Sequence, residues 1–407
     1  MSDFAERAGQ ALEHSGYSIT AAARALNYDR AFLSRVLNRK QQPSLRLAQM
    51  LDDLTDSGGD LYRLVAKQSS PDPSPGLPVP VLSLPDLAPD PDLNDRITRT
   101  MEGLRHHVDA SVIEWLHRCL AEHRKAEDTI GAGPVIAVVQ AQLSSVSALT
   151  RNASGPLADQ LTSLVAQYAQ FVAWMCNDLG DKAAALGWYD RAHDWAMEAG
   201  DASMAATALS MKAHLAWSVG NPTRTVRLSE AARWHEGRIT PGVQGMATQM
   251  TARGHALGGD ASATLAALDT AERLIRRAAE HPEDEPSWMY FYGETWLAGQ
   301  RGMIMLDLVE RTGRDASQAI APLELFLNQL PATYVRDRAW YGACLARAHS
   351  AAGDLDAASQ TARTFAPDAV RLNRYAADDL RTLHGLLSRR MSSDPGIREL
   401  GEVLQCA

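Results

Sequence analysis

Hydrophobic residues recur every three or four positions along most of the chain, a spacing that is typical of amphipathic helices. From about residue 94 to the C-terminus this spacing continues almost throughout and is interrupted by Gly-Asp or Gly-Asn pairs. No run of alternating β-branched residues indicates a strand. We therefore predict an all-α protein.

A proline-rich segment divides this pattern into two domains. Residues 68–95 contain eight of the 19 prolines of the 407-residue chain. Proline lacks a backbone N–H donor and fixes φ, so this segment can form neither a helix nor a central strand. We predict an N-terminal domain over residues 1–67, a semi-rigid linker over 68–95 and a helical domain over 96–407.

The two domains differ in charge. The whole chain has a formal net charge of −9, of which residues 1–67 carry +1 and the remaining residues carry −10. Between residues 20 and 46, six basic side chains are opposed by a single acidic one, Asp29. This local excess of positive charge favours a DNA-binding element in the first domain.

Residues 19–38 predict two short helices joined by a tight turn. Asn27 lies at the turn and tolerates a left-handed backbone conformation, and Asp29 is a favourable N-cap for the second helix. The apolar inner faces of the two helices are formed by Ala22, Ala23, Leu26, Leu33, Val36 and Leu37.

This pattern resembles the helix-turn-helix of the lambda-repressor-like, or XRE, family over residues 3–66. The family usually has glycine where this chain has Asn27, and asparagine is the commonest substitute at a positive φ. The resemblance implies an N-terminal lambda-repressor-like helix-turn-helix domain with further helices at Phe4–His14, Leu45–Leu54 and Leu61–Val65. It also implies that the second helix of the pair enters the major groove of double-stranded DNA.

The outward residues of that second helix are therefore the predicted DNA contacts. Arg30 and Arg35 can each offer a bidentate fork to guanine, and Ala31 can touch a thymine methyl group. Residues at the end of the helix suit phosphate contacts. The predicted DNA-binding residues are Arg30, Ala31, Ser34, Arg35, Asn38, Arg39 and Lys40.

Gly-Asp and Gly-Asn pairs recur in the second domain at intervals near 40 residues, a period that is typical of helical solenoids. They are Gly180-Asp181, Gly220-Asn221, Gly259-Asp260 and Gly353-Asp354. The first two intervals are 40 and 39 residues, and a looser Gly313-Arg314-Asp315 divides the third, of 94 residues, into 54 and 40. Small residues near these pairs, such as Ala173 seven positions before Gly180, match the tetratricopeptide (TPR) pattern. We predict an α-solenoid of TPR-like helix pairs whose first helices line the inner surface.

Polar and aromatic side chains project toward that inner surface. Amide side chains can bond an extended peptide backbone, and tryptophan can cover its apolar side chains. The predicted ligand-binding residues are Gln167, Gln170, Trp174, Asn177, Ser210, His214, Trp217 and Arg253.

The chain has no nucleotide-binding, metalloprotease or nucleophile-elbow motif, so we predict no enzyme, no cofactor and no metal site. No stretch approaches 18 consecutive apolar residues, and the first 16 residues have no apolar core like that of a signal peptide. The four cysteines lie far apart in the sequence. These features predict a reduced, cytoplasmic protein without membrane attachment.

A helix-turn-helix followed by a TPR array is similar to the ligand-controlled bacterial regulators grouped as RRNPP, and to actinobacterial XRE–TPR regulators. The resemblance implies a quorum-sensing-like transcriptional regulator, a homodimer on an inverted-repeat operator, with a peptide or small molecule in the TPR groove. Two alternatives stay open: a DNA-binding regulator whose TPR array docks a protein partner, and a TPR scaffold with a vestigial DNA-binding head.

Overall fold

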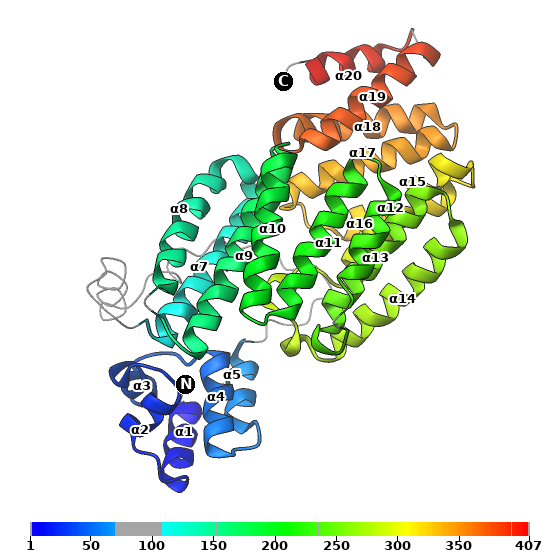
Figure 1. Cartoon of the computed structure of the whole chain (residues 1–407). Coiled ribbons are helices and arrows are strands. Elements are labelled where there is room, and N and C mark those ends of the chain that lie inside the picture. The colour runs from blue at the N-terminus through cyan, green and yellow to red at the C-terminus, as the bar shows by residue number, and fades with distance from the viewer. Residues whose placement is uncertain (1, 70–107, 152, 235, 392, 406–407) are drawn as a thin grey trace. The chain divides into compact units, whose positions relative to one another are not determined.

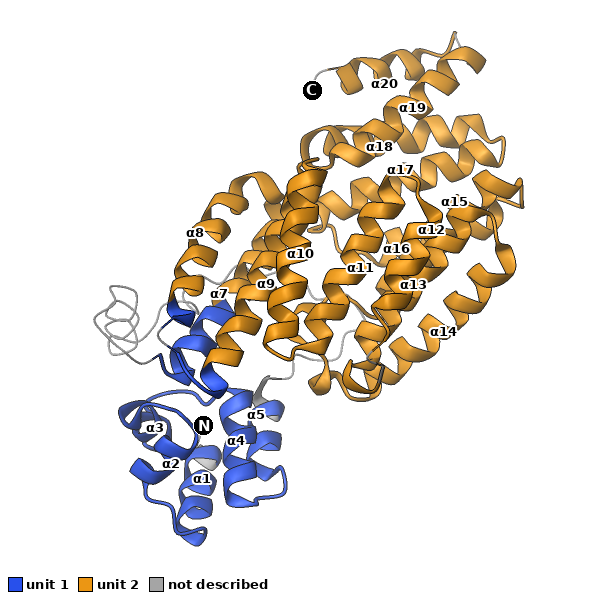
Figure 2. Ribbon diagram, viewed as in Figure 1, with its two compact units in different colours: residues 1–75, 84–118, 149–157 blue, residues 76–83, 119–148, 158–407 orange. Residues whose placement is uncertain are grey.

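The computed structural model describes residues 2–69, 108–151, 153–234, 236–391 and 393–405. Every regular element in these ranges is a helix, which confirms the all-α prediction for the described part of the chain (Figure 1). The predicted linker over 68–95 lies outside these ranges from residue 70 onward. The described residues form two compact units (Figure 2).

Unit 1 contains residues 2–69, 108–118 and 149–157. Its first five helices are α1 (Ser2–His14), α2 (Ile19–Ala25), α3 (Arg30–Leu37), α4 (Leu45–Thr55) and α5 (Asp60–Ser69). Their buried faces meet in one core, in which Phe4, Leu33 and Leu47 are at most 1% exposed. The helices predicted in this region are therefore confirmed as helices.

The beginning of helix α7 (Ala110–Ile130) also belongs to unit 1, although the sequence pattern places it in the second domain. Ala110 is buried in the core of this unit, and its N–H donates a hydrogen bond to the carbonyl oxygen of Asn27, at 3.1 Å. This contact joins residues that lie far apart in the sequence, which is why periodicity alone does not reveal it.

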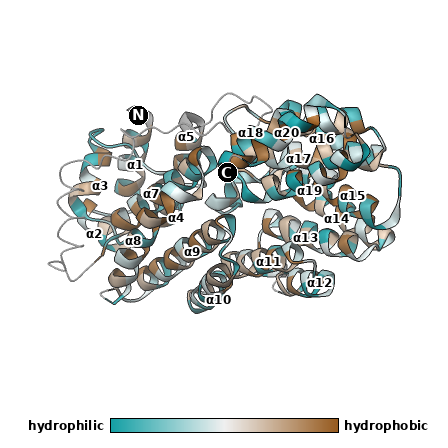
Figure 3. Cartoon of the chain, turned by 90° about the horizontal axis from the view of Figure 1, so that it is seen from above, coloured by the Kyte–Doolittle hydropathy of each residue, from teal (hydrophilic) through white to brown (hydrophobic). Residues whose placement is uncertain are grey.

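Unit 2 consists mainly of consecutive antiparallel helix pairs. The pairs are α9 (Pro156–Asp178) with α10 (Lys182–Glu198), α11 (Ala202–Ser218) with α12 (Pro222–Ala231), α13 (Pro241–Gly258) with α14 (Ala261–Glu280), α15 (Glu294–Thr312) with α16 (Ser317–Gln329), α17 (Val335–Ala351) with α18 (Leu355–Leu372), and α19 (Arg374–Arg390) with α20 (Pro395–Gln405). Figure 3 shows hydrophobic and hydrophilic residues side by side along these helices, as expected when each helix buries only part of its surface.

The predicted Gly-Asp and Gly-Asn pairs form the turns inside these helix pairs. Gly180, for example, has a φ of 86°, and the Asp181 side chain accepts a hydrogen bond from the N–H of Ala184 at the start of α10. Glycine adopts a positive φ without the steric cost that other residues meet, so it ends one helix where aspartate begins the next. Gly200 and Asp201 repeat this arrangement between α10 and α11, at a junction that the predicted spacing did not include.

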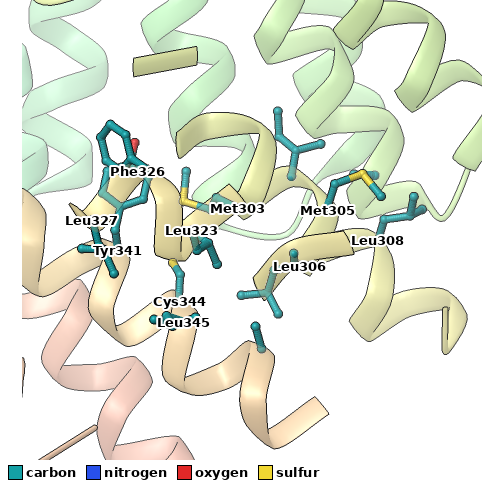
Figure 4. Close-up of a cluster of buried hydrophobic side chains, with 14 of the residues drawn as sticks. Met303, Met305, Leu306, Leu308, Leu323, Phe326, Leu327, Tyr341, Cys344 and Leu345 are labelled. Atoms are coloured by element: carbon teal, nitrogen blue, oxygen red, sulfur yellow. The ribbon is translucent and has the colours of Figure 1, made fainter. Parts of the chain in front are cut away.

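Small residues allow the helices of each pair to approach closely. The predicted contact residue Ala173 is fully buried, and so are Ala213, Ala252 and Ala346 on the first helices of later pairs. Glycine extends this principle, since a Cβ atom added at Gly342 of α17 would lie only 2.2 Å from the ring of Phe365 on α18. Figure 4 shows the resulting dense cluster of side chains from α15, α16 and α17.

Helix α8 (Ala132–Thr150) is the one helix of the described residues that is long and apolar enough to cross a membrane, by length and composition alone. Core helices of globular proteins meet the same criteria. Its residues Val135, Val139, Leu143 and Val146 are buried at helical spacing. We therefore interpret α8 as a helix that packs by one apolar face.

Candidate functional site

The turn between α2 and α3 has the conformation that its sequence predicts. Asn27 has a φ of 57°, which confirms the left-handed turn residue. The Asp29 carboxylate accepts hydrogen bonds from the N–H groups of Ala31 and Phe32, at 2.8 and 3.1 Å, which confirms the N-cap. These two local features fix where α3 begins and thereby which of its residues face outward.

The predicted DNA-binding residues fall into two groups by exposure. Arg30, Ala31, Asn38, Arg39 and Lys40 are exposed, whereas Ser34 and Arg35 are half-buried. Arg35 is thus less accessible than Arg30, and its role as a base contact stays a prediction.

Some of the exposed residues already have partners within unit 1. The Asn38 side-chain amide donates to the carbonyl oxygen of Ser34 at 2.7 Å, and the guanidinium of Arg39 lies 3.4 Å from the carboxylate of Glu6. No carboxylate of the described residues forms an ion pair with Arg30 or Lys40. Among the predicted DNA-binding residues, the charges of these two side chains are therefore the ones most accessible to a polyanion.

Helix α7 is hydrogen-bonded to the turn between α2 and α3 through Glu114. The Tyr28 hydroxyl donates a hydrogen bond to Glu114, and the Ser44 hydroxyl donates to the same carboxylate oxygen at 3.0 Å. Burial raises the pKa of Glu114 above its usual range, and the two hydroxyl donors oppose that shift. Glu114 thus connects the α2–α3 turn, the start of α4 and α7 within unit 1.

Unit 2 contains a cavity of about 210 Å³ that is lined mainly by the first helix of successive pairs. A single buried water needs only about 10–15 Å³, so the space suits a much larger occupant. Most of the predicted ligand-binding residues meet here, namely Gln170, Trp174, Asn177, His214, Trp217 and Arg253. Gln167 and Ser210 are buried on the same helices but do not line the cavity.

A row of aromatic rings forms one wall of the cavity. The ring of His214 lies 6.0 Å from that of Trp174 and 5.5 Å from that of Trp217, measured between centroids, and Trp340 follows 6.5 Å beyond Trp217. Burial, with the nearby Arg253 and Lys182, lowers the pKa of His214 to about 3. His214 is therefore neutral at pH 7, so its ring adds aromatic surface and no charge to this wall.

A chain of hydrogen bonds among amide and phenol groups also borders the cavity. Tyr292 donates to the carbonyl oxygen of Gln249 at 3.2 Å, and the Gln249 amide donates to Gln300 at the same distance. The Gln300 amide donates in turn to the hydroxyl of Tyr341 at 2.6 Å. These buried polar groups already have hydrogen-bond partners in one another. They therefore fix the position of this part of the wall and do not need a ligand as a partner.

Acidic side chains surround Arg336 on another side of the cavity. Its guanidinium forms an ion pair with Glu127 and lies 3.9 Å from a carboxylate oxygen of Asp128 and 3.6 Å from one of Asp337. Arg336 and Glu127 are 4% and 2% exposed, so this pair is removed from solvent. The partners lie 209 residues apart and join α7 to α17 within unit 2.

Two carboxyl groups in the cavity lining, those of Asp128 and Asp178, have raised pKa values. Burial, followed by repulsion from Asp337, raises the pKa of both Asp128 and Asp178 to about 7. In the sequence Asp178 and Asp181 are most simply interpreted as partners of a helix end. The structure supports that interpretation for Asp181, which caps α10, and places Asp178 in the cavity lining.

Arg253 contrasts with Arg336. It is 3% exposed, and its guanidinium carbon lies 3.9 Å from the centroid of the Trp217 ring. Its terminal nitrogens contact only thioether sulfurs, that of Met303 at 3.2 Å and that of Met250 at 3.9 Å, and its Nε has no hydrogen-bond partner. Burial lowers its pKa, but a guanidinium keeps its proton at neutral pH.

Sequence reasoning missed much of the cavity wall. Trp288, Tyr290, Phe291 and Tyr292 reach the cavity from an irregular segment between α14 and α15, and Trp296 follows at the start of α15. Five aromatic residues within nine positions are a visible signal in the sequence. The predicted ligand-binding residues come only from the first helix of each repeat, and these five aromatic residues lie in or next to the connection between two repeats.

No group of three or more His, Cys, Asp or Glu side chains in the described part of the chain is arranged to hold a metal ion. Comparison with known proteins gives no further identification, since no protein-family model and no curated protein matches the chain. The interpretation of both sites therefore depends on their geometry and chemistry.

Proposed function

We propose that this protein is a cytoplasmic, sequence-specific DNA-binding transcriptional regulator whose TPR-like array binds a peptide or small-molecule effector. The observation that carries the proposal is the pair α2 and α3, a short two-helix element with a left-handed turn residue, a capped second helix and exposed basic residues on that helix. Such an element has the features of a helix-turn-helix whose second helix enters the major groove.

Arg30 is the best candidate for reading bases. It is the first residue of α3, and in helix-turn-helix proteins the N-terminal residues of the second helix meet the base edges. Lys40 follows the end of the helix, where a compact ammonium group suits a phosphate. The two side chains thus have different expected effects on sequence preference.

The effector is proposed to bind in the cavity of unit 2. Aromatic walls with a few buried polar groups are typical of small-molecule sites. Helix α7 offers a route for its effect, since it carries Glu114, which binds the α2–α3 turn, and Glu127 and Asp128, which line the cavity. An occupant that changes the contacts of Glu127 or Asp128 would act on the helix that also holds the turn.

The DNA-binding part is tested by selecting duplexes from a random library with the full-length protein and measuring affinities for them. Arg30→Ala should cost ~1–3 kcal/mol and relax the preference at one position of each half-site. Lys40→Ala should weaken all duplexes alike and reduce the salt dependence by about one charge. Arg7→Ala, an exposed arginine on α1, is the matched control and should leave the sequence preference unchanged.

If Arg30→Ala and Lys40→Ala change affinity identically across the library, α3 does not read bases. Failure of the wild-type protein to select any duplex would favour a scaffold with a vestigial head.

The regulator is further proposed to bind its operator as a homodimer on an inverted repeat. A single small DNA-binding module covers only ~600–1,000 Å², so two modules provide the area that tight specific binding requires. Light scattering at micromolar concentration measures the mass of the full-length protein directly. A strictly monomeric protein, together with selected duplexes that contain a single half-site, would contradict this part of the proposal.

A further inference from the structure

Arg253 is a buried charge that no carboxylate of the described residues contacts directly. A guanidinium that is removed from water loses favourable hydration, and this loss is normally offset by an ion pair or by strong hydrogen bonds. The nitrogens of Arg253 meet two thioether sulfurs, which are weak acceptors, and the Nε meets no acceptor at all. The cavity therefore contains hydrogen-bond donors whose natural partner, an anion, is missing from the described residues.

Asp307 is close enough to Arg253 for their charges to attract, which opposes the lowering of the Arg253 pKa by burial. Its carboxylate accepts a hydrogen bond from the indole N–H of Trp217 at 2.8 Å, however, and among the described residues it forms no hydrogen bond with Arg253. The same cavity also contains Arg336, which three carboxyl groups surround. The fold thus places carboxyl groups in direct contact with Arg336, whereas Arg253 has only the more distant charge of Asp307.

A second arginine repeats the pattern of Arg253. Arg124 lines the cavity, is 7% exposed and lies over the ring of Phe171, 5.9 Å from its centroid. One of its terminal nitrogens has no hydrogen-bond partner. Burial lowers the pKa of Arg124 to about 10, so it also remains charged at neutral pH.

The surroundings of Arg253 indicate what must accompany the anion. Trp217 covers one face of the guanidinium, Met250 and Met303 lie at its edge, and the neutral His214 is adjacent to Trp217. An occupant that is charged throughout would lose its hydration against these groups. A molecule with one anionic group on an apolar body matches both features.

We propose that the cavity binds an apolar molecule through a carboxylate group, which Arg253 receives by charge-assisted hydrogen bonds. This inference rests on the proposed function only in taking the cavity as the effector site. The planar fork of arginine pairs with a carboxylate through two parallel hydrogen bonds. The carboxylate can belong to the C-terminus of a short apolar peptide or to an aliphatic or aromatic acid, and the experiment distinguishes these sources.

The test uses two matched pairs of probes with the full-length protein. Decanoate is compared with decanamide, and an apolar hexapeptide with a free C-terminus is compared with the same peptide amidated. Binding is followed by calorimetry and by the fluorescence of the tryptophans in the cavity wall. Each probe is titrated into the wild type, into Arg253→Met, and into Arg276→Met as a control at an exposed arginine on α14.

We expect the wild type and Arg276→Met to bind at least one carboxylate probe about 10- to 100-fold more tightly than its amide. In Arg253→Met this preference should disappear, while binding of the amide stays within a few-fold of wild type. Arg253→Lys keeps the charge but not the fork, so it should retain part of the preference even if Arg253→Met fails to fold. Preference for decanoate alone identifies a small acid, and preference for the free peptide alone identifies a peptide C-terminus.

Equal affinity of the wild type for carboxylates and amides, or an unchanged preference in both Arg253 variants, would overturn the proposal. Its failure is distinguishable from failure of the proposed function. Probes that bind through Arg253 without changing DNA affinity would contradict the function alone. An amide that binds equally well and changes DNA affinity would contradict the carboxylate alone.

Discussion

Two buried arginines in the lining of the same cavity have opposite surroundings. On the side of α7 and α17, Arg336 is surrounded by Glu127, Asp128 and Asp337. On the side of α11 and α13, Arg253 stacks on Trp217 and meets only sulfur atoms at its terminal nitrogens. The first arrangement is complete within the protein, and the second becomes complete only with an added anion. The difference separates a residue that holds the fold from one that is available to a ligand.

The largest expected effect is that of Arg336→Met. This substitution leaves Glu127 buried without its counter-charge, which typically costs about 3–5 kcal/mol. Denaturant unfolding of the full-length protein measures the loss. The double variant Arg336→Met/Glu127→Gln should recover part of it, because the uncompensated charge is then removed. A stability within about 1 kcal/mol of wild type for Arg336→Met would show that the ion pair does not hold α7 to α17.

Arg253→Met should raise the free energy of unfolding, whereas Arg336→Met should lower it. The substitution removes a buried charge that no carboxylate of the described residues contacts directly, and methionine is compatible with neighbours such as Met250 and Met303. Recovery of the desolvation cost should exceed the loss of ~2 kcal/mol from the contact with Trp217, so we expect a free energy of unfolding about 1 kcal/mol above wild type. Denaturant unfolding measures this change as well. A loss of stability comparable to that of Arg336→Met would show that Arg253, like Arg336, stabilises the fold.

The smallest effect concerns pH. The pKa of Asp178 in the folded protein is about 7, well above its usual value, so the folded state favours the protonated carboxyl. This contribution to stability is complete at acidic pH below the usual aspartate pKa and is lost as pH rises through about 7.

Asp178→Asn removes this titration. Between about pH 6.5 and pH 8 the variant should therefore gain stability relative to wild type, by roughly 1 kcal/mol or less. Thermal melts of both proteins across this range measure the difference. A stability difference that does not change with pH would mean that Asp178 titrates normally.

Local rules predicted the parts of the structure that depend on neighbours in sequence. The conformation of Asn27 follows from the tolerance of asparagine for a positive φ, and the cap at Asp29 follows from its position before an apolar periodic segment. The turns at Gly180 and the buried Ala173 follow from helix pairs that repeat at a regular interval. Each of these features involves residues within a few turns of one another.

Contacts between distant segments lay beyond those rules. Nothing in the local sequence of Arg253 or Arg336 shows which of them has carboxylate partners, because Glu127 lies 209 residues before Arg336. The half-buried position of Arg35 depends likewise on how α3 packs against the core of unit 1. Periodicity places a side chain on a face of a helix, whereas its partners depend on what the fold brings against that face.

We propose that a ligand in the cavity of unit 2 controls DNA binding by α3. The most direct measurement is the affinity of the full-length protein for a selected duplex, with and without the low-molecular-weight fraction of a bacterial cell extract. We expect this affinity to change about 5- to 150-fold for wild type and not at all for Arg253→Met, with equal affinities of the two proteins when the fraction is absent. A wild-type affinity that no fraction alters, or a response that Arg253→Met retains in full, would contradict it.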